Sequence, residues 1–347
     1  MEAYKILLVR WDSPGHFRNL STIANYLFSH NNEISIATVT ECKREDTGLA
    51  PNITWHSFGL ASGNRPLMKG RLKIIYWLAR EIKNIPHDVL YVFDSWTIPY
   101  VIAARIMAGK QKIPWIYHTV DWLEPGRYPL YSAIEKWACH NARVVINTDR
   151  TRARLQQALY KLEEMPAWVP NYLSCSEIIP ERDENLRLQL LGEKSPDNSI
   201  LLIHPTIASP ARLVIEIIRS LPFVDKRVVL LQIAKDNDYK RECIKVATEI
   251  GVINKVIFHE PVSYPKLLQF LKCADISAIF HDHRPSSGYF LCNADRLSLL
   301  AACGIPFVAS NYPNMEALVY RYGLGECCDP YSPQSIAAAI NLSLIHI

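Results

Sequence analysis

The sequence lacks several features that would place it in other classes of protein. It contains no run of about 18 apolar residues, and the apolar run within residues 1–10 is too short for a signal peptide. Its nine cysteines are scattered and form no Cys-x-x-Cys motif, which argues against a structural zinc site. No repeat of short period indicates a solenoid. We therefore expect a cytoplasmic protein whose thiols are reduced.

Strong charge of one sign is also missing. The formal net charge of +4 does not by itself indicate a nucleic-acid partner, and no glycine–aromatic RNA motif accompanies it. Basic residues do gather in one segment, residues 65–83, which has a single acid, Glu81. They are Arg65, Lys69, Arg71, Lys73, Arg80 and Lys83. Such a helix either packs with a solvated outer face or rests peripherally on the inner, anionic face of a membrane.

What is present is an alternation of short apolar runs with helical patterns along 347 residues, half of them hydrophobic. Strands are expected at residues 5–10, 33–40, 89–93, 115–117 and 144–147, and again at 200–203, 228–233, 256–258, 276–280 and 307–309. Between 170 and 198 the pattern gives way to Pro, Ser, Asn and mixed charge. The sequence therefore predicts an α/β protein with two tandem, doubly wound, Rossmann-like domains, residues 1–170 and 171–341, facing one interdomain cleft.

Several segments, in order, carry a resemblance to a known family. Residues 293–310 combine a helix, a glycine stop and a buried strand, and residues 113–121 and 135–149 contain a strand ending in a histidine, then a helix and a strand. Val169-Pro-Asn171 and, within residues 293–310, Gly304-Ile-Pro306 also occur in the order that the family has. Together these segments resemble family 4 glycosyltransferases. The resemblance implies a GT-B fold, with an N-terminal acceptor-side domain and a C-terminal domain for a nucleotide-sugar donor.

The resemblance implies a donor site near the start of the helix at residues 296–303. Arg296 falls where the family has a basic residue for the donor diphosphate, and Asp295 precedes it. A helix N-terminus and a guanidinium both suit phosphate. Arg212 lies where the family carries a second basic residue for the same phosphates. We expect Arg296, Arg212 and Asp295 in the donor site, with a solvated surface role as the alternative for the arginines.

In the first domain the resemblance points to two loops that follow strands. Gly15 and His16 lie after the first strand, where the family has a loop that touches donor phosphate or acceptor. His118 ends a later strand and Asp121 follows three residues on, so a sugar or acceptor contact is expected from the first and positioning of the acceptor hydroxyl from the second. An ordinary turn and a histidine satisfied by backbone groups are the alternatives.

No metal or other cofactor is expected, since the nucleotide sugar is a co-substrate. Asp236-Asn-Asp238 matches a metal-binding Asp-x-Asp pattern, but it lies at a helix entry, where Asp and Asn are common caps. His281-Asp-His283 has no further ligand cluster beside it in the sequence.

The leading hypothesis is a retaining hexosyltransferase that moves a sugar from a nucleotide donor to a glycan or lipid-linked acceptor in cell-surface polysaccharide synthesis. Leu299 and Leu291 stand where the family has glutamates, and Pro205 lacks an N–H for a phosphate, which favours a non-enzymatic binding subunit as an alternative. A GT-B nucleotide-sugar epimerase is a third reading. Residues 342–347 resemble a translated adapter of sequencing libraries, so we expect them not to be natural sequence.

Overall fold

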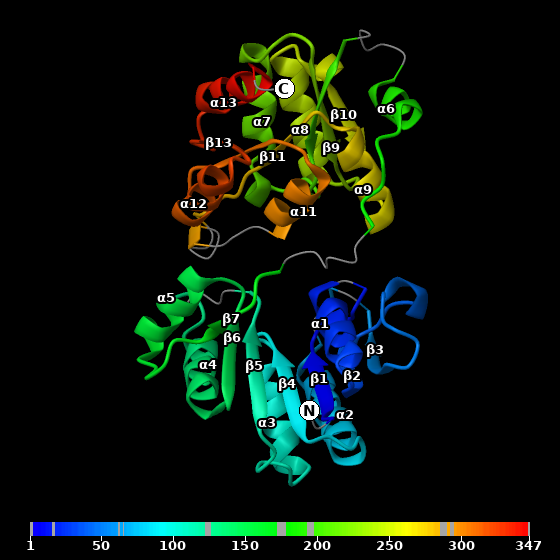
Figure 1. The fold of residues 1–347 in the computed structure, drawn as a ribbon, viewed down its shortest axis with the longest axis vertical. Coiled ribbons are helices and arrows are strands. Elements are labelled where there is room, and N and C mark those ends of the chain that lie inside the picture. Colours follow the sequence, from blue (N-terminus) through cyan, green and yellow to red (C-terminus); the bar gives the residue numbers. More distant parts are fainter. Residues whose placement is uncertain are drawn as a thin grey trace. The chain divides into compact units, whose positions relative to one another are not determined.

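The computed structural model describes residues 3–15, 18–61, 63–64, 66–121, 126–171, 178–192, 198–284, 290–291 and 295–345. The chain divides into two compact units, Met1–Asn171 and Tyr172–Ile347, called unit 1 and unit 2 below (Figure 1).

Unit 1 is built on a seven-stranded sheet of order β3-β2-β1-β4-β5-β6-β7, in which every neighbouring pair is parallel. The strands are β1 (Lys5–Arg10), β2 (Glu33–Thr40), β3 (Thr54–Leu60), β4 (Val89–Phe93), β5 (Trp115–Thr119), β6 (Val144–Asn147) and β7 (Ala167–Trp168). The order reverses at β1, which has β2 on one side and β4 on the other. Doubly wound sheets bind ligands at the carboxyl ends of their strands beside such a reversal.

Helices cover both faces of this sheet because its strands are apolar on both sides. Ile6 and Leu8 pack with α1 on one face, whereas Leu7 and Val9 pack with α2 and α3 on the other. The helices of unit 1 are α1 (Arg18–Ser29), the short η1 (Arg44–Asp46), α2 (Met68–Asn84), α3 (Ile98–Met107), α4 (Pro129–Asn141) and α5 (Arg150–Tyr160).

Unit 2 repeats this plan with a six-stranded parallel sheet of order β10-β9-β8-β11-β12-β13. The strands are β8 (Ile200–His204), β9 (Val228–Ile233), β10 (Val256–His259), β11 (Ile276–Ile279), β12 (Phe307–Ser310) and β13 (Gly325–Cys328). The predicted pair of doubly wound α/β folds is confirmed. Five predicted strands, at residues 5–10, 33–40, 89–93, 144–147 and 228–233, have the predicted ends.

Two sets of helices cover the sheet of unit 2. Leu201 and Ile203 face the core formed with α6, α9, α11 and α12, and Leu202 faces the core formed with α7, α8 and α13. The helices are α6 (Glu184–Leu191), η2 (Pro210–Arg212), α7 (Val214–Ser220), η3 (Leu221–Phe223), α8 (Asp238–Glu249), η4 (Ile253–Lys255), α9 (Tyr264–Cys273), α11 (Asp295–Cys303), α12 (Pro313–Tyr322) and α13 (Pro333–Ile345).

In two segments the structure differs from what the sequence pattern predicts. The expected connection at residues 170–198 contains α6, whose Leu186 and Leu190 belong to the core of unit 2. Residues 342–345, within the expected adapter tail, continue α13, and Leu344 packs against that unit's second core.

The last strand of unit 2 begins with a glycine in very close contact with its neighbour. Gly325 pairs with Phe307 across the β12–β13 ladder, and a Cβ added at Gly325 would lie only 1.8 Å from the carbonyl oxygen of Phe307. No side chain fits at that distance, so the strand pairing requires glycine here.

All eight tryptophans of the sequence precede residue 170 and therefore lie in unit 1. Across the described ranges, no helix has both the length and the apolar character that crossing a bilayer requires.

Candidate active site

The carboxyl edge of the sheet in unit 1 brings together three residues that are far apart in the chain. Arg10 ends β1, Asp94 follows β4 directly, and His118 lies near the end of β5. Because β1, β4 and β5 are neighbours in the sheet, their carboxyl ends meet at one edge. The sequence pattern predicts a role for His118 but for neither Arg10 nor Asp94.

Asp94 organises this edge. Its carboxylate forms a buried ion pair with Arg10, with 2.6 Å between Oδ2 and Nη2. Its other oxygen accepts hydrogen bonds from the backbone N–H of Val120 at 2.9 Å and of Asp121 at 3.1 Å. Asp94 has a left-handed backbone, with φ of 60°, which Asp tolerates better than most residues. The carboxylate thus fixes the chain that leaves β5 immediately after His118.

His118 is completely buried, in contrast to the contact with a sugar or acceptor that was expected of it. Its Nδ1 lies 3.0 Å from the hydroxyl of Tyr91, and within the described residues its Nε2 has no hydrogen-bond partner. Burial, reinforced by the positive charge of Arg10, lowers the pKa of His118 to about 3. The imidazole is therefore neutral, able to exchange a hydrogen bond with a hydroxyl but unable to supply charge.

Two of the other predicted residues of unit 1, Asp121 and Gly15, lie in loops. Asp121 is exposed just after β5. Gly15 lies in the turn after β1, where a Cβ would approach Cys42 Sγ to 2.9 Å and Asp46 O to 3.2 Å, so glycine permits close packing of this turn. His16 lies outside the described residues.

In unit 2 the two predicted arginines converge on His204, the last residue of β8. This histidine is fully buried, and its Nδ1 lies 2.8 Å from Gln232 Oε1. The pKa of His204 is lowered to about 3, mainly by burial, which the hydrogen bond with Gln232 partly opposes and to which the charges of Arg296 and Arg212 add. Arg296, the second residue of α11, donates from Nε to Pro205 O at 3.2 Å. Two partly exposed guanidiniums thus share one neighbourhood at the carboxyl end of β8.

The helix that carries Arg296 begins at Asp295, whose side chain lies outside the description. Leu299, three residues beyond Arg296, is buried in the hydrophobic core of unit 2. Leu291 is partly buried, and its carbonyl accepts a hydrogen bond from Asn314 at 2.9 Å. Neither leucine can hydrogen-bond a ribose through its side chain.

A polar cluster that sequence analysis did not assign to the site lies at the same edge of this sheet, after β11. Asp282 accepts hydrogen bonds from Arg284 at 2.6 Å and from the Tyr331 hydroxyl at 2.7 Å, while its backbone N–H donates to Ala211 O. His283 Nδ1 lies 2.9 Å from the same hydroxyl. The hydrogen bond from Arg284 holds the pKa of Asp282 at about 2. Asp282 thereby ties the turn before Arg212 to this cluster.

The two metal-like motifs have other partners. Asn237 caps α8 by accepting from the Lys240 N–H at 3.0 Å, and Arg241 forms ion pairs with both Asp236 and Asp238. Over the described ranges, no three or more His, Cys, Asp or Glu side chains gather closely enough to hold a metal ion.

Comparison with known proteins found one family model that matches part of unit 1. Residues 5–149 match the family described as glycosyl transferase 4-like. No curated protein sequence matches the chain.

The fold of the whole chain is shared with solved structures. HepE of Anabaena, solved with UDP-glucose, has a TM-score of 0.72 at 18% identity over 98% of this chain and 90% of that one. WaaG, a glycosyltransferase involved in lipopolysaccharide biosynthesis, has a TM-score of 0.69 at 14% identity over 98% and 90%. A Listeria monocytogenes protein described as a UDP-N-acetylglucosamine 2-epimerase has a TM-score of 0.65 at 11% identity over 100% and 89%. The predicted GT-B fold is confirmed for the whole chain, and the resemblance to family 4 glycosyltransferases is confirmed for residues 5–149.

Proposed function

Since residues 5–149 match a glycosyl transferase family and the whole chain has the GT-B fold, we propose that the protein is a glycosyltransferase. It moves a sugar from a nucleotide-sugar donor to a glycan or lipid-linked acceptor, with retention at the anomeric carbon, in the synthesis of cell-surface polysaccharide. The observation that carries this proposal is the convergence of Arg296 and Arg212 on the carboxyl end of β8.

The donor diphosphate is the group that this pair of arginines suits. When the bond between the anomeric carbon and the diphosphate breaks, negative charge grows on the leaving oxygen. Guanidiniums bind phosphate oxygens in a fixed fork, and the first turn of α11 adds the positive end of the helix dipole. Charge stabilisation by protein groups makes a metal ion unnecessary in this proposal.

The acceptor side of the reaction is assigned to unit 1. Asp121, an exposed carboxylate two residues beyond the end of β5, is assigned to the acceptor hydroxyl, and the neutral, buried His118 supports the end of the same strand as a positioning residue. Asp94 holds the backbone of Asp121 in place, so it acts as a positioning residue.

The protein is proposed to work in the cytoplasm, peripherally on the inner face of the membrane. Support comes from α2, which buries Ile74, Leu78 and Ile82 but leaves Leu72 and Tyr76 exposed among its basic residues. An exposed apolar and cationic face suits anionic lipid.

Donor binding is tested by thermal shift with UDP-glucose and GDP-mannose. A ligand at 100 times its dissociation constant stabilises a protein by about 2.7 kcal/mol, so one of the two is expected to raise the midpoint. Arg296→Ala is expected to abolish the shift, because it removes the guanidinium that binds the diphosphate. Arg219→Ala, which removes an exposed arginine at the end of α7, is the matched control and should retain the shift.

Measuring sugar transfer alongside donor binding distinguishes the proposed role of unit 1 from that of unit 2. His118→Ala should keep the donor shift but stop transfer to the acceptor. A full shift in Arg296→Ala would contradict the assignment of the phosphate site.

Two other functions have specific support. Leu299 stands where the resemblance implies a glutamate that holds the donor ribose, and it is buried in the core of unit 2, which favours a binding subunit without activity. The absence of any shift with nucleotide sugars would support that reading. The second function is that of a nucleotide-sugar epimerase, which is favoured by the fold shared with a protein described as an epimerase. Conversion of a UDP-sugar to its epimer without an acceptor would establish it.

A further inference from the structure

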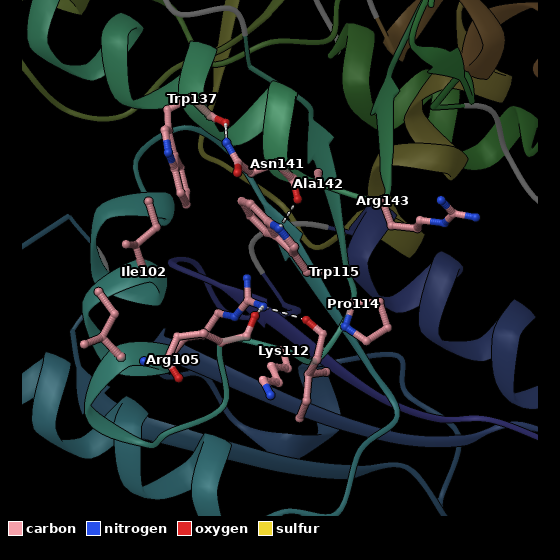
Figure 2. Close-up of a pocket in the computed structure, with 12 residues that line it drawn as sticks. Ile102, Arg105, Lys112, Pro114, Trp115, Trp137, Asn141, Ala142 and Arg143 are labelled. Atoms are coloured by element: carbon pink, nitrogen blue, oxygen red, sulfur yellow. Dashed lines mark hydrogen bonds between the residues drawn. The ribbon is translucent and has the colours of Figure 1, made fainter.

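A pocket of about 530 Å³ opens at the amino-terminal edge of the sheet in unit 1, between the end of α3, the start of β5 and the end of α4 (Figure 2). Trp115 begins β5, whereas His118 lies three residues further along that strand. At the rise of a β-strand these two positions are about 10 Å apart, so the pocket is separate from the candidate active site.

The pocket is basic and contains no acid. Arg105, Lys112 and Arg143 line it, and none of its twelve lining residues is Asp or Glu. Within the described residues none of these three cations forms an ion pair, in contrast to the buried Arg10, which is paired with Asp94. A positive cavity without a counter-charge favours an anionic ligand.

Arg105 supplies the strongest evidence for that anion. The residue is only 7% exposed, and its guanidinium lies 5.3 Å from the ring centroid of Trp115. One nitrogen, Nη2, donates to Gln111 O at 2.9 Å and to Ile113 O at 2.6 Å. Its Nε is buried and has no partner among the described residues. A buried charge with an unused donor is costly unless an anion or acceptor reaches it.

The other lining groups suit a sugar ring and its hydroxyls. Trp137 is 47% exposed, with its ring centroid 6.5 Å from that of Trp115, so it presents an indole surface at the pocket. Asn141 donates from Nδ2 to Trp137 O at 2.8 Å, which leaves its Oδ1 available to accept from a hydroxyl. The exposed amide of Gln111 adds a donor and an acceptor. Indole surface, amides and cations match a ring, its hydroxyls and an acidic substituent.

We propose that this pocket binds a saccharide that carries an acidic group, either a uronate or a sugar phosphate. The carboxylate or phosphate lies beside Arg105 and Lys112, Arg143 adds positive charge at the rim, and the ring lies against Trp137 (Figure 2).

Calorimetric titration with a glucuronic-acid disaccharide, glucose 6-phosphate and neutral maltose tests the proposal. At least one acidic sugar should bind saturably and about tenfold or more tightly than maltose, because charge-assisted bonds are lost with the neutral ligand. Binding of both acids would show that any acidic group suffices, and binding of one would identify the carboxylate or the phosphate as its source.

Variants locate the binding. Lys112→Gln/Arg143→Gln, at two exposed positions, should weaken the acidic sugar about tenfold or more, and Trp137→Ala should weaken it as well. Lys136→Gln removes an exposed charge from the same helix outside the pocket lining and should leave binding unchanged. All three should keep the donor shift, which separates this site from the proposed donor site.

Three results would overturn the proposal: equal affinity for maltose, unchanged affinity in Lys112→Gln/Arg143→Gln, or adsorption to anionic vesicles with no binding of either acidic sugar.

Discussion

At the residue scale, each unit keeps one histidine near the carboxyl end of a central strand in its neutral form. His118 and His204 are both fully buried, and burial lowers the pKa of each to about 3. His118 is hydrogen-bonded to a tyrosine hydroxyl and His204 to the amide of Gln232, so among the described residues neither is hydrogen-bonded to a carboxylate that would stabilise an imidazolium.

The two histidines should make stability depend on pH in a defined window. Below a pH of about 6.5 the unfolded chain protonates each histidine while the folded unit does not, so the unfolded state binds more protons. The stabilisation is complete above that pH and is lost as the pH falls toward about 3. Each histidine should contribute a slope of about 1.4 kcal/mol per pH unit within the window. Urea unfolding between pH 7.5 and pH 5 measures this slope.

Tryptophan fluorescence reports the unfolding of unit 1 alone, because all eight tryptophans lie in that unit. The pH dependence of stability that it detects therefore belongs to unit 1. His118→Asn should reduce the slope of the fluorescence-detected pH dependence by about 1.4 kcal/mol per pH unit, whereas His204→Asn should leave it unchanged. Equal slopes for the wild type and His118→Asn would show that His118 is protonated in the folded state.

His118 and Arg296 could be predicted as site residues because strand ends and helix starts are visible in a pattern of apolar residues. It could not find Arg10 and Asp94, which pair only because β1 and β4 are neighbours in the sheet. The burial of His118 was equally hidden, since it depends on how three strands and their loops pack.

At the scale of elements, α2 shows how one helix can have two different roles. Its inner face packs on the sheet through Ile74, Leu78 and Ile82, while Leu72 is 61% and Tyr76 is 67% exposed. Exposed Lys69, Lys73 and Lys83 lie on the same helix. A purely solvated face has no need of the two exposed apolar side chains.

Leu72→Gln/Tyr76→Gln should therefore weaken sedimentation with vesicles that contain anionic lipid, by about tenfold or more, because each side chain loses apolar burial in the interface. Leu188→Gln, at an exposed leucine of α6 in unit 2, is the matched control. If the double variant and the wild type sediment equally, α2 is not the membrane-binding element.

Elements were predicted well where the chain is continuously apolar and poorly elsewhere. The strand β9 is buried along its whole length, and its ends were predicted correctly. The edge strand β3 was missed because its sequence mixes polar and aromatic residues and most of its side chains are partly exposed. The helix α6 was hidden within a stretch of Pro, Ser and mixed charge.

At the scale of the whole molecule, the chain contains two units with separate hydrophobic cores. The indoles report on one of them alone, whereas backbone ellipticity reports on both. The stabilising effect of a buried interaction can therefore be assigned to its unit.

The Arg10–Asp94 pair offers such a test. Asp94→Asn preserves the left-handed backbone but leaves the Arg10 charge buried without its partner, a change that costs about 3–5 kcal/mol in comparable pairs. The fluorescence transition in urea should move to lower concentration, while the part of the ellipticity change that belongs to unit 2 stays in place. Arg10→Met/Asp94→Asn should recover much of the loss. A fluorescence midpoint that does not move in Asp94→Asn would show that the pair adds nothing to stability.

The pairing of β12 with β13 constrains how this chain can evolve. Most positions in a sheet tolerate a change of side chain if volume is kept, but at Gly325 the neighbouring carbonyl already occupies the space of a Cβ. The residues around this strand can therefore change during evolution, whereas position 325 should remain glycine, whose side chain is a single hydrogen atom.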